Sequence, residues 1–240
     1  MEAMTYITSL TAPALWEPPA GVRVRGTLAL VAGAGESPRV YERFGRRISA
    51  DGYLVGVFET ADAAEAARWL TAQDAAPRVL AGSDVGAAAA LTVAADGASV
   101  DGVIVAALPV GGAQNGQADA AQRTACPVHL GVLDGADARA ARPVADIEVP
   151  DAAALARIAV PVLAIHGGAD PIASFPGAHQ ALGSIAELEL VETIDGLHDA
   201  LNDVSHRSVA AAIVLWLERL RGVGVETPIV RTTTIRKGSS

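Results

Sequence analysis

The sequence of 240 residues is poor in the residue types on which several classes of protein depend. Its single cysteine, Cys126, excludes an internal disulfide and a metal site built from cysteines. Its single lysine is Lys237, and 18 Lys and Arg residues against 27 Asp and Glu give a net charge of −9. Such a chain is a poor partner for nucleic acid or an anionic membrane surface, so we expect a small neutral molecule as its ligand.

Long apolar stretches are missing as well. Runs such as Val85–Ala95 are much shorter than the about 20 residues that span a bilayer. The N-terminus has no basic stretch followed by an apolar one, so we expect a cytoplasmic protein without a membrane span. No two histidines have metal-ligand spacing, and we expect no metal or other cofactor.

The remaining composition, 51% hydrophobic and 19% charged, is typical of a globular domain. Apolar runs that suit buried strands cover residues 26–32, 53–58, 78–81, 102–108, 126–133, 160–166 and 188–194. Helix-like stretches lie between them, at residues 40–50, 61–72, 85–95, 151–158, 178–183 and 207–221. The alternation predicts a three-layer α/β fold with a mostly parallel central sheet.

Residues 111–151 interrupt this alternation. They begin with a glycine-rich loop at 111–117 and continue with what we interpret as an extra strand within 126–137. We expect residues 1–225 to form a single domain and residues 226–240 to be a tail whose polar end is typical of disorder.

The first candidate site is the turn GAGESP at residues 33–38, which follows the run at 26–32 and leads into a helix that carries Tyr41. Backbone N–H groups in such a loop can hold an anion or an oxyanion. The same residues also suit an ordinary tight turn between strand and helix, so the loop alone leaves both interpretations open.

The second candidate site is GSDVG at residues 82–86. A nucleophile elbow needs small residues two places before and two places after its exposed residue, because strand and helix approach closely around a strained turn. Gly82 and Gly86 flank Asp84 at that spacing, and Ser83 stands one place too early. Aspartate is also a good helix N-cap, so an elbow and a cap both remain open.

Asp170 and His198 form the third candidate site, each on a loop after an apolar run. With Asp84 they give the order nucleophile, acid, histidine along the chain, as in α/β hydrolases. Asp134 and Asp137 are alternative acids. The other histidines lie in predicted strands (His129, His166) or helices (His179, His206) and are weaker candidates.

These blocks resemble the α/β-hydrolase superfamily, and within it the monoglyceride lipase and lysophospholipase branch. Residues 33–38 and the later DGY at 51–53 are similar to that branch's oxyanion loop and the end of its next helix. Residues 160–170 and 196–203, followed by a helix with Trp216, are similar to its acid and histidine blocks. The resemblance covers most of the chain.

The resemblance implies a role for each candidate residue. The N–H groups of Ala34 and Val85 would form an oxyanion hole, Asp170 would orient His198, and Asp84 stands where the family has a nucleophilic serine. The segment that forms a cap in the family is short here, so we expect a minimal cap or none. We expect the substrate pocket to include Glu36, Tyr41 and Ser83.

A carboxylate at the elbow would attack an sp³ carbon that carries a halide or an epoxide oxygen, and histidine-activated water would then hydrolyse the ester. Such an enzyme resembles haloalkane dehalogenases and epoxide hydrolases, although the chain offers few residues to stabilise the leaving group. We therefore expect a hydrolase of a small neutral molecule with a triad of Asp84, His198 and Asp170.

Three alternatives stay open at this point. An esterase-like enzyme that works in another way, or a protein of this fold without hydrolytic activity, would also accommodate an aspartate at position 84. A dinucleotide-binding protein would place its phosphate loop at Gly33 and Gly35 and a ribose-binding acid at Glu59.

Overall fold

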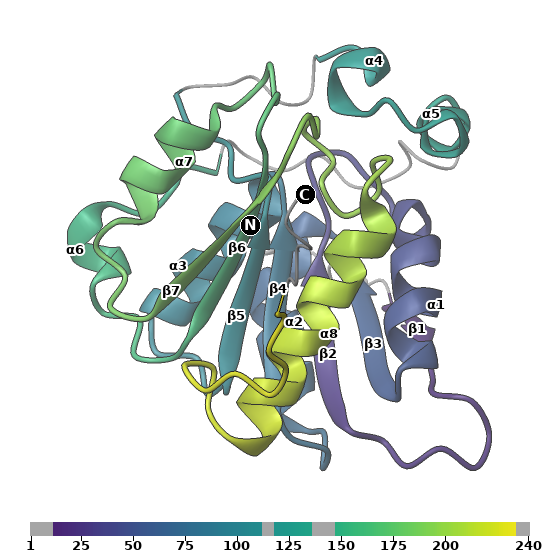
Figure 1. Ribbon diagram of the computed structural model, residues 1–240, viewed down its shortest axis with the longest axis vertical. Helices are drawn as coiled ribbons and strands as arrows, with labels where there is room; N and C mark the ends of the chain where they lie inside the picture. Colours follow the sequence, from purple (N-terminus) through teal and green to yellow (C-terminus); the bar gives the residue numbers. More distant parts are fainter. Residues whose placement is uncertain (1–11, 112–117, 136–146, 234–240) are drawn as a thin grey trace, which may run out of the picture.

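The protein is built on a central sheet with helices on both faces (Figure 1). The computed structural model describes residues 12–111, 118–135 and 147–233. Its strands are β1 (Ala14–Trp16), β2 (Gly26–Val31), β3 (Tyr53–Phe58), β4 (Arg78–Ser83), β5 (Gly102–Ala106), β6 (Val162–Gly167) and β7 (Leu188–Thr193). They form a seven-stranded sheet in the order β1-β3-β2-β4-β5-β6-β7. Only β1 runs antiparallel to its neighbour, so the expected fold class is confirmed.

The α-helices are α1 (Glu42–Ala50), α2 (Ala63–Thr71), α3 (Val85–Ala95), α4 (Ala120–Arg123), α5 (Pro127–Leu133), α6 (Ala152–Leu155), α7 (Phe175–Leu182) and α8 (His206–Gly222). Two 3-10 helices, η1 (Pro38–Tyr41) and η2 (Thr60–Asp62), precede α1 and α2. No helix in the part of the chain that the structure describes is long and apolar enough to cross a membrane.

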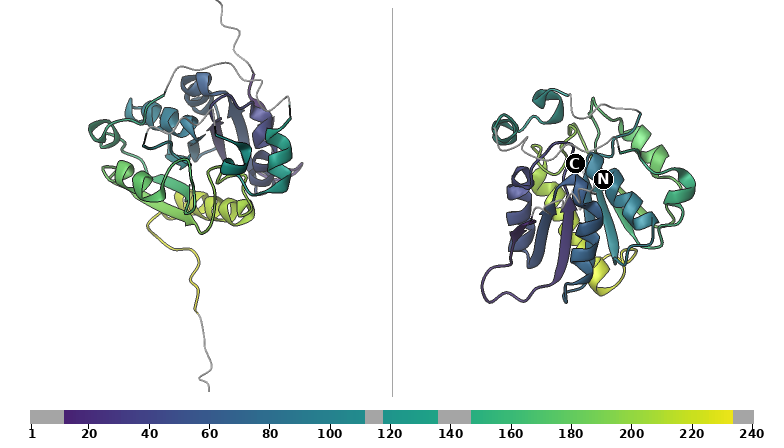
Figure 2. Two further views of the ribbon diagram at one scale, coloured as in Figure 1. Left: turned by 90° about the horizontal axis from the view of Figure 1, so that it is seen from above. Right: turned by 180° about the vertical axis from the view of Figure 1, so that it is seen from behind.

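Two hydrophobic cores lie on opposite faces of the sheet because successive side chains of a strand alternate in direction. In β2, Leu28 and Leu30 pack into the core beneath α1 and α8, which includes Trp216. Ala29 and Val31 pack into the other core, beneath α2 and α3. Figure 1 and the view from behind in Figure 2 show these two helix layers. Every residue of β2 is buried, which explains its continuous apolar sequence.

The extra strand predicted within residues 126–137 is wrong, because residues 127–133 form helix α5. Pro127 occupies the first turn, where its missing N–H costs nothing. His129 and Leu133 are buried while Val128 is 67% exposed, so one helical face is covered rather than two faces of a strand. Strand β1, by contrast, has no counterpart among the predicted strands. The loop at 112–117, Asp137 and the end of the tail, residues 234–240, lie outside the described residues.

The candidate residues gather beyond the carboxyl ends of the parallel strands, the edge at which α/β proteins place their ligands. The loops after β2, β4, β6 and β7 all open at this edge. Helices α4 and α5 lie over the same edge, at the top of Figure 1. Both helices belong to the segment between residues 111 and 151, which the sequence predicts to form a minimal cap or none.

Candidate active site

Asp84 lies at a strained turn between β4 and α3, with φ 55° and ψ −128°. A Cβ atom on Gly82 would lie 2.1 Å from the carbonyl oxygen of Gly86, and one on Gly86 would lie 2.3 Å from that of Val31. Both glycines are therefore required where strand and helix approach. Asp84 occupies the N-cap position of α3, but its side chain makes no capping hydrogen bond, and the strained turn with small residues on both sides is what an elbow requires.

Asp84, His198 and Asp170 come together at this turn. The Nε2 atom of His198 lies 3.5 Å from Asp84 Oδ1, and its Nδ1 atom lies 2.7 Å from Asp170 Oδ2. The backbone N–H groups of Ile172 and Ala173 donate to Asp170 Oδ1 and hold that carboxylate in place. Neither Asp84 nor His198 has exposed surface. The alternative acid Asp134 lies at the exposed end of α5.

The two carboxylates set the charge of the imidazole between them. Burial alone lowers the pKa of His198, but hydrogen bonds to Asp170 and Asp84 and the charges of both outweigh it and raise the pKa to about 9. Burial raises the pKa of Asp170, but hydrogen bonds from His166 and His198 hold it well below its usual range. At neutral pH the imidazole of His198 is therefore protonated.

This charge arrangement predicts a pH-dependent stability. The pKa of His198 is higher in the folded protein, about 9, than the ordinary value of 6.5, so its contribution is complete below pH 6.5 and is lost as the pH rises through 9. The shift corresponds to about 3 kcal/mol of unfolding free energy. Urea unfolding at both ends of this range should show that loss in the wild type and not in His198→Gln. Equal pH dependence in the two proteins would contradict the assignment.

The loop after β2 faces the elbow. The N–H group of Ala34 donates to Asp84 Oδ2 at 3.4 Å, and that of Gly33 donates to the Tyr41 hydroxyl at 3.1 Å. Val85 is the first residue of α3, so its N–H has no partner within the helix. An oxyanion hole formed by Ala34 and Val85 remains a prediction that this geometry allows.

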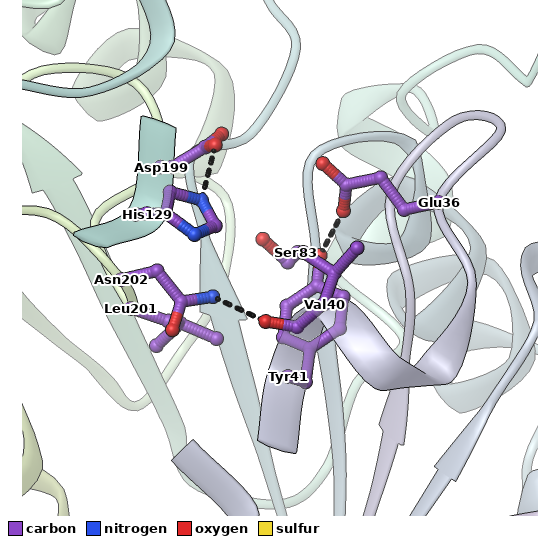
Figure 3. Close-up of a pocket in the computed structure, with 8 residues that line it drawn as sticks. All are labelled: Glu36, Val40, Tyr41, Ser83, His129, Asp199, Leu201 and Asn202. Carbon is purple, nitrogen blue, oxygen red and sulfur yellow. Dashed lines mark hydrogen bonds and ion pairs between the residues drawn. The ribbon is translucent and has the colours of Figure 1, made fainter. Parts of the chain in front are cut away.

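A narrow pocket lies beside the elbow (Figure 3). Its lining includes all three residues expected in the substrate pocket, Glu36, Tyr41 and Ser83. The Tyr41 hydroxyl donates to Glu36 Oε2. The space is too narrow to hold a water molecule, and Asp84, His198 and Asp170 are not among the residues that line it. The remaining lining residues are Val40, His129, Asp199, Leu201 and Asn202.

Three further buried residues lie at this site: Arg123 and Asp199, which no sequence motif indicates, and His129, which the sequence offers only as a weaker candidate. One terminal nitrogen of Arg123, Nη2, lies 2.7 Å from Glu36 Oε1 and 2.8 Å from Asp199 Oδ1. The other, Nη1, lies 3.6 Å from Asp84 Oδ2. The Nε2 atom of His129 lies 2.8 Å from Asp199 Oδ2, which places this histidine in the site rather than in a strand.

Burial and charge act in opposite directions on this cluster. Burial raises the pKa of Glu36, and the positive charge of Arg123 opposes that rise. Burial also raises the pKa of Asp199, but the charge of Arg123 and the hydrogen bond to His129 bring it below its usual value. The charges of Glu36, Asp199 and Asp84 keep Arg123 protonated despite its burial. No group of three or more His, Cys, Asp or Glu side chains in the described ranges could hold a metal ion.

Solved structures with the same fold include lipases, esterases and a putative non-heme bromoperoxidase. A monoacylglycerol lipase from Paleococcus ferrophilus aligns with a TM-score of 0.68 and 17% identity, over 88% of this chain and 100% of its own. A soluble variant of monoglyceride lipase from Saccharomyces cerevisiae, in complex with a substrate analogue, gives 0.68 and 15%, over 91% and 99%. The esterase domain of a Rhodothermus marinus protein gives 0.60 and 20%, over 88% and 93%.

The chain therefore has the α/β-hydrolase fold. Its sequence alone matches no family model and no curated protein. The strand order also differs from the one typical of dinucleotide-binding domains. Counted from the strand before the glycine-rich loop, the third strand of such a domain lies beyond the second strand and away from the first. In this protein the third strand so counted, β4, pairs directly with the first, β2. Here β2 lies directly between β3 and β4, and the antiparallel β1 occupies the edge beyond β3.

Proposed function

We propose that the protein is a hydrolase in which Asp84 is the nucleophile, His198 the general base and Asp170 the residue that orients His198. The observation that carries this proposal is the position of a carboxylate at a strained elbow, with φ 55° and an imidazole nitrogen 3.5 Å away. Strain of this kind is retained where the surrounding structure holds it, most often at functional sites. A carboxylate at this position favours displacement at carbon over acyl transfer to serine.

In the first step an oxygen of Asp84 bonds to an sp³ carbon of the substrate. The bond from that carbon to its leaving group, a halide or an epoxide oxygen, breaks, and the leaving group takes the electron pair. The product of this step is an alkyl ester of Asp84. A carboxylate nucleophile attacks through its own oxygen lone pair, so this step needs no general base.

In the second step water attacks the ester carbonyl of Asp84 while His198 accepts its proton. The tetrahedral intermediate then breaks the bond from the carbonyl carbon to the alkoxy oxygen, which takes that proton and leaves as the alcohol, and the carboxylate of Asp84 is regenerated. The charge of Asp84 and the hydrogen bond to it are two of the causes that raise the pKa of His198. Esterification removes that charge, so the pKa of His198 falls and the neutral imidazole that accepts the proton becomes more populated. The N–H groups of Ala34 and Val85 would stabilise the oxyanion that forms on the attacked carbonyl.

The substrate is small and carries no negative charge in this proposal. Four buried carboxylates surround the site, from Glu36, Asp84, Asp170 and Asp199, against the cations of Arg123 and His198. An anion would be repelled there. Tyr41 is the single aromatic residue that lines the described pocket, so a leaving-group stabiliser made of tryptophan is not part of the proposal.

A second candidate is a protein of this fold without hydrolytic activity. The observation that favours it is the complete burial of Asp84 and His198, with Arg123 placed against the Asp84 carboxylate.

Substitution Asp84→Ser separates the two candidates. A serine at the elbow, beside His198 and a working oxyanion hole, should hydrolyse p-nitrophenyl esters about 100-fold faster than the background reaction. The wild type should instead hydrolyse members of a panel of haloalkanes and epoxides. The double variant Asp84→Ser with His198→Gln is the control and should lose the gained esterase activity. A wild type inactive on the whole panel, together with no gain in Asp84→Ser, would favour the inactive protein.

A further inference from the structure

The two carboxylate oxygens of Asp84 have different surroundings. Oδ2 accepts a hydrogen bond from the N–H group of Ala34 at 3.4 Å and lies 3.6 Å from Nη1 of Arg123. Oδ1 lies 3.5 Å from Nε2 of His198, and both of these atoms are buried without a hydrogen-bond partner among the described residues. Donors therefore hold one oxygen, while the lone pairs of the other accept no hydrogen bond.

These surroundings give each oxygen of Asp84 a separate place in the proposed reaction. Oδ1 bonds to the substrate carbon and becomes the alkoxy oxygen of the ester, and Oδ2 becomes its carbonyl oxygen. When water attacks the carbonyl carbon, an electron pair of the carbonyl bond moves onto Oδ2, which becomes the oxyanion. The groups that contact Oδ2 in this structure are therefore those that face the developing negative charge.

Contacts with two other carboxylates hold Arg123 beside Oδ2. Arg123 is the last residue of α4 and is 7% exposed. Its Nη2 atom lies 2.7 Å from Glu36 Oε1 and 2.8 Å from Asp199 Oδ1, and its Nε atom donates to Asp199 Oδ2 at 3.3 Å. These contacts use two of the three guanidinium nitrogens, and the third, Nη1, faces Asp84.

The loop after β2 supplies both groups at Oδ2. Ala34 donates its own N–H group, and Glu36, two residues later, holds the guanidinium of Arg123. The hydroxyl of Tyr41 in turn donates to Glu36 and fixes its carboxylate. A buried cation that is already in place stabilises an oxyanion without reorganisation at the moment of reaction.

We propose that Arg123 is a further catalytic residue, whose guanidinium stabilises the negative charge on Oδ2 of Asp84 while water hydrolyses the ester. This role rests on the proposed function. It gives Arg123 opposite effects on the two steps, because the cation stabilises the carboxylate that begins the first step and the oxyanion that forms in the second. A residue with a structural role alone would affect both steps in the same direction.

Substitution Arg123→Gln tests these opposite effects. In a single turnover with a haloalkane or epoxide, followed by mass spectrometry of the intact protein, the ester at Asp84 should form at least as fast as in the wild type. Its hydrolysis should be about 100-fold slower, so the adduct accumulates. Arg123→Lys keeps the charge without the planar fork and should recover about tenfold of that loss. Arg46→Gln is the control, since it removes an exposed cation paired with Glu42 and should match the wild type.

A second variant guards against loss of folding. Without Arg123, Glu36 and Asp199 lose the cation that they share, and unpaired buried carboxylates destabilise a protein. Glu36→Gln combined with Arg123→Gln removes one acid together with the cation. If Arg123→Gln unfolds, the double variant should fold and accumulate the adduct, whereas Glu36→Gln alone should accumulate less.

An Asp84→Ser background tests the same cation without the proposed reaction. The oxygen of the introduced serine bonds to the boron of phenylboronic acid, its proton passes to His198, and the boron becomes tetrahedral and anionic. Adding Arg123→Gln in this background should weaken phenylboronic acid binding at least about tenfold by calorimetry, because the cation beside the anionic group is lost. Adding Arg46→Gln should leave the binding unchanged.

Two results would overturn the role of Arg123. One is ester hydrolysis at the same rate in Arg123→Gln and the wild type, and the other is equal binding of phenylboronic acid with and without Arg123, including binding by neither. Failure of the proposed function leaves a different signature. In that case no variant forms an adduct at Asp84, while phenylboronic acid binding in the Asp84→Ser background still depends on Arg123.

Discussion

The substitution His198→Gln is expected to stop the reaction after its first step. Asp84 attacks the substrate carbon without help from a base, so the alkyl ester should still form. Hydrolysis of that ester needs a base for water, and loss of a positioned general base costs about 10³-fold in rate. The variant should therefore accumulate covalently modified protein and release almost no alcohol.

Intact-protein mass spectrometry measures this accumulation directly. The mass of His198→Gln should rise by that of one alkyl group, located by peptide mapping at Asp84. His179→Gln is the control, because His179 is exposed on α7 and lies outside the proposed triad. It should turn over without an adduct. Steady turnover by His198→Gln would remove that residue from the proposed mechanism.

The second large effect is expected from Gly82→Ala. The added Cβ atom would lie 2.1 Å from the carbonyl oxygen of Gly86 and 2.6 Å from the backbone nitrogen of Ala87. Both are backbone atoms of helix α3, so no side chain can move aside to make room. Overpacking typically costs about 1–3 kcal/mol of unfolding free energy, and a clash with backbone atoms puts this variant at the upper end of that range.

Gly222→Ala is the control for that loss. Gly222 ends α8, and a Cβ atom added to it would have no other atom within 4 Å. The unfolding free energy of this variant in urea should equal or slightly exceed that of the wild type. An unfolding curve of Gly82→Ala that overlays the wild-type curve would show that the close approach of strand and helix is not required.

Most of the fold follows from patterns that depend on neighbouring residues alone. Strand β3 and helix α3 have the predicted bounds, because a buried strand and a helix of small apolar residues both leave a clear local pattern. The strand predicted in place of helix α5 is wrong because the run of apolar residues is short and two of its valines are exposed, Val128 and Val132. Periodicity cannot distinguish a short helix from a strand.

The candidate site was likewise predictable from the sequence only in part. The glycine spacing around Asp84 and the order of Asp170 and His198 are visible along the chain. The contacts of Arg123 with Glu36 and Asp199 join residues 87 and 76 positions apart, and no local pattern marks them. Asp199 could have been proposed as a site residue from the sequence, because it directly follows the candidate histidine His198.

The most direct test of the account is the fate of water oxygen in a single turnover. With enzyme in excess over a haloalkane or epoxide substrate in ¹⁸O-water, hydrolysis through an Asp84 ester places the heavy oxygen in the Asp84 carboxylate. The alcohol formed in that turnover then carries an oxygen taken from the protein. Heavy oxygen found only in the alcohol, with Asp84 unlabelled, would contradict a covalent aspartyl intermediate.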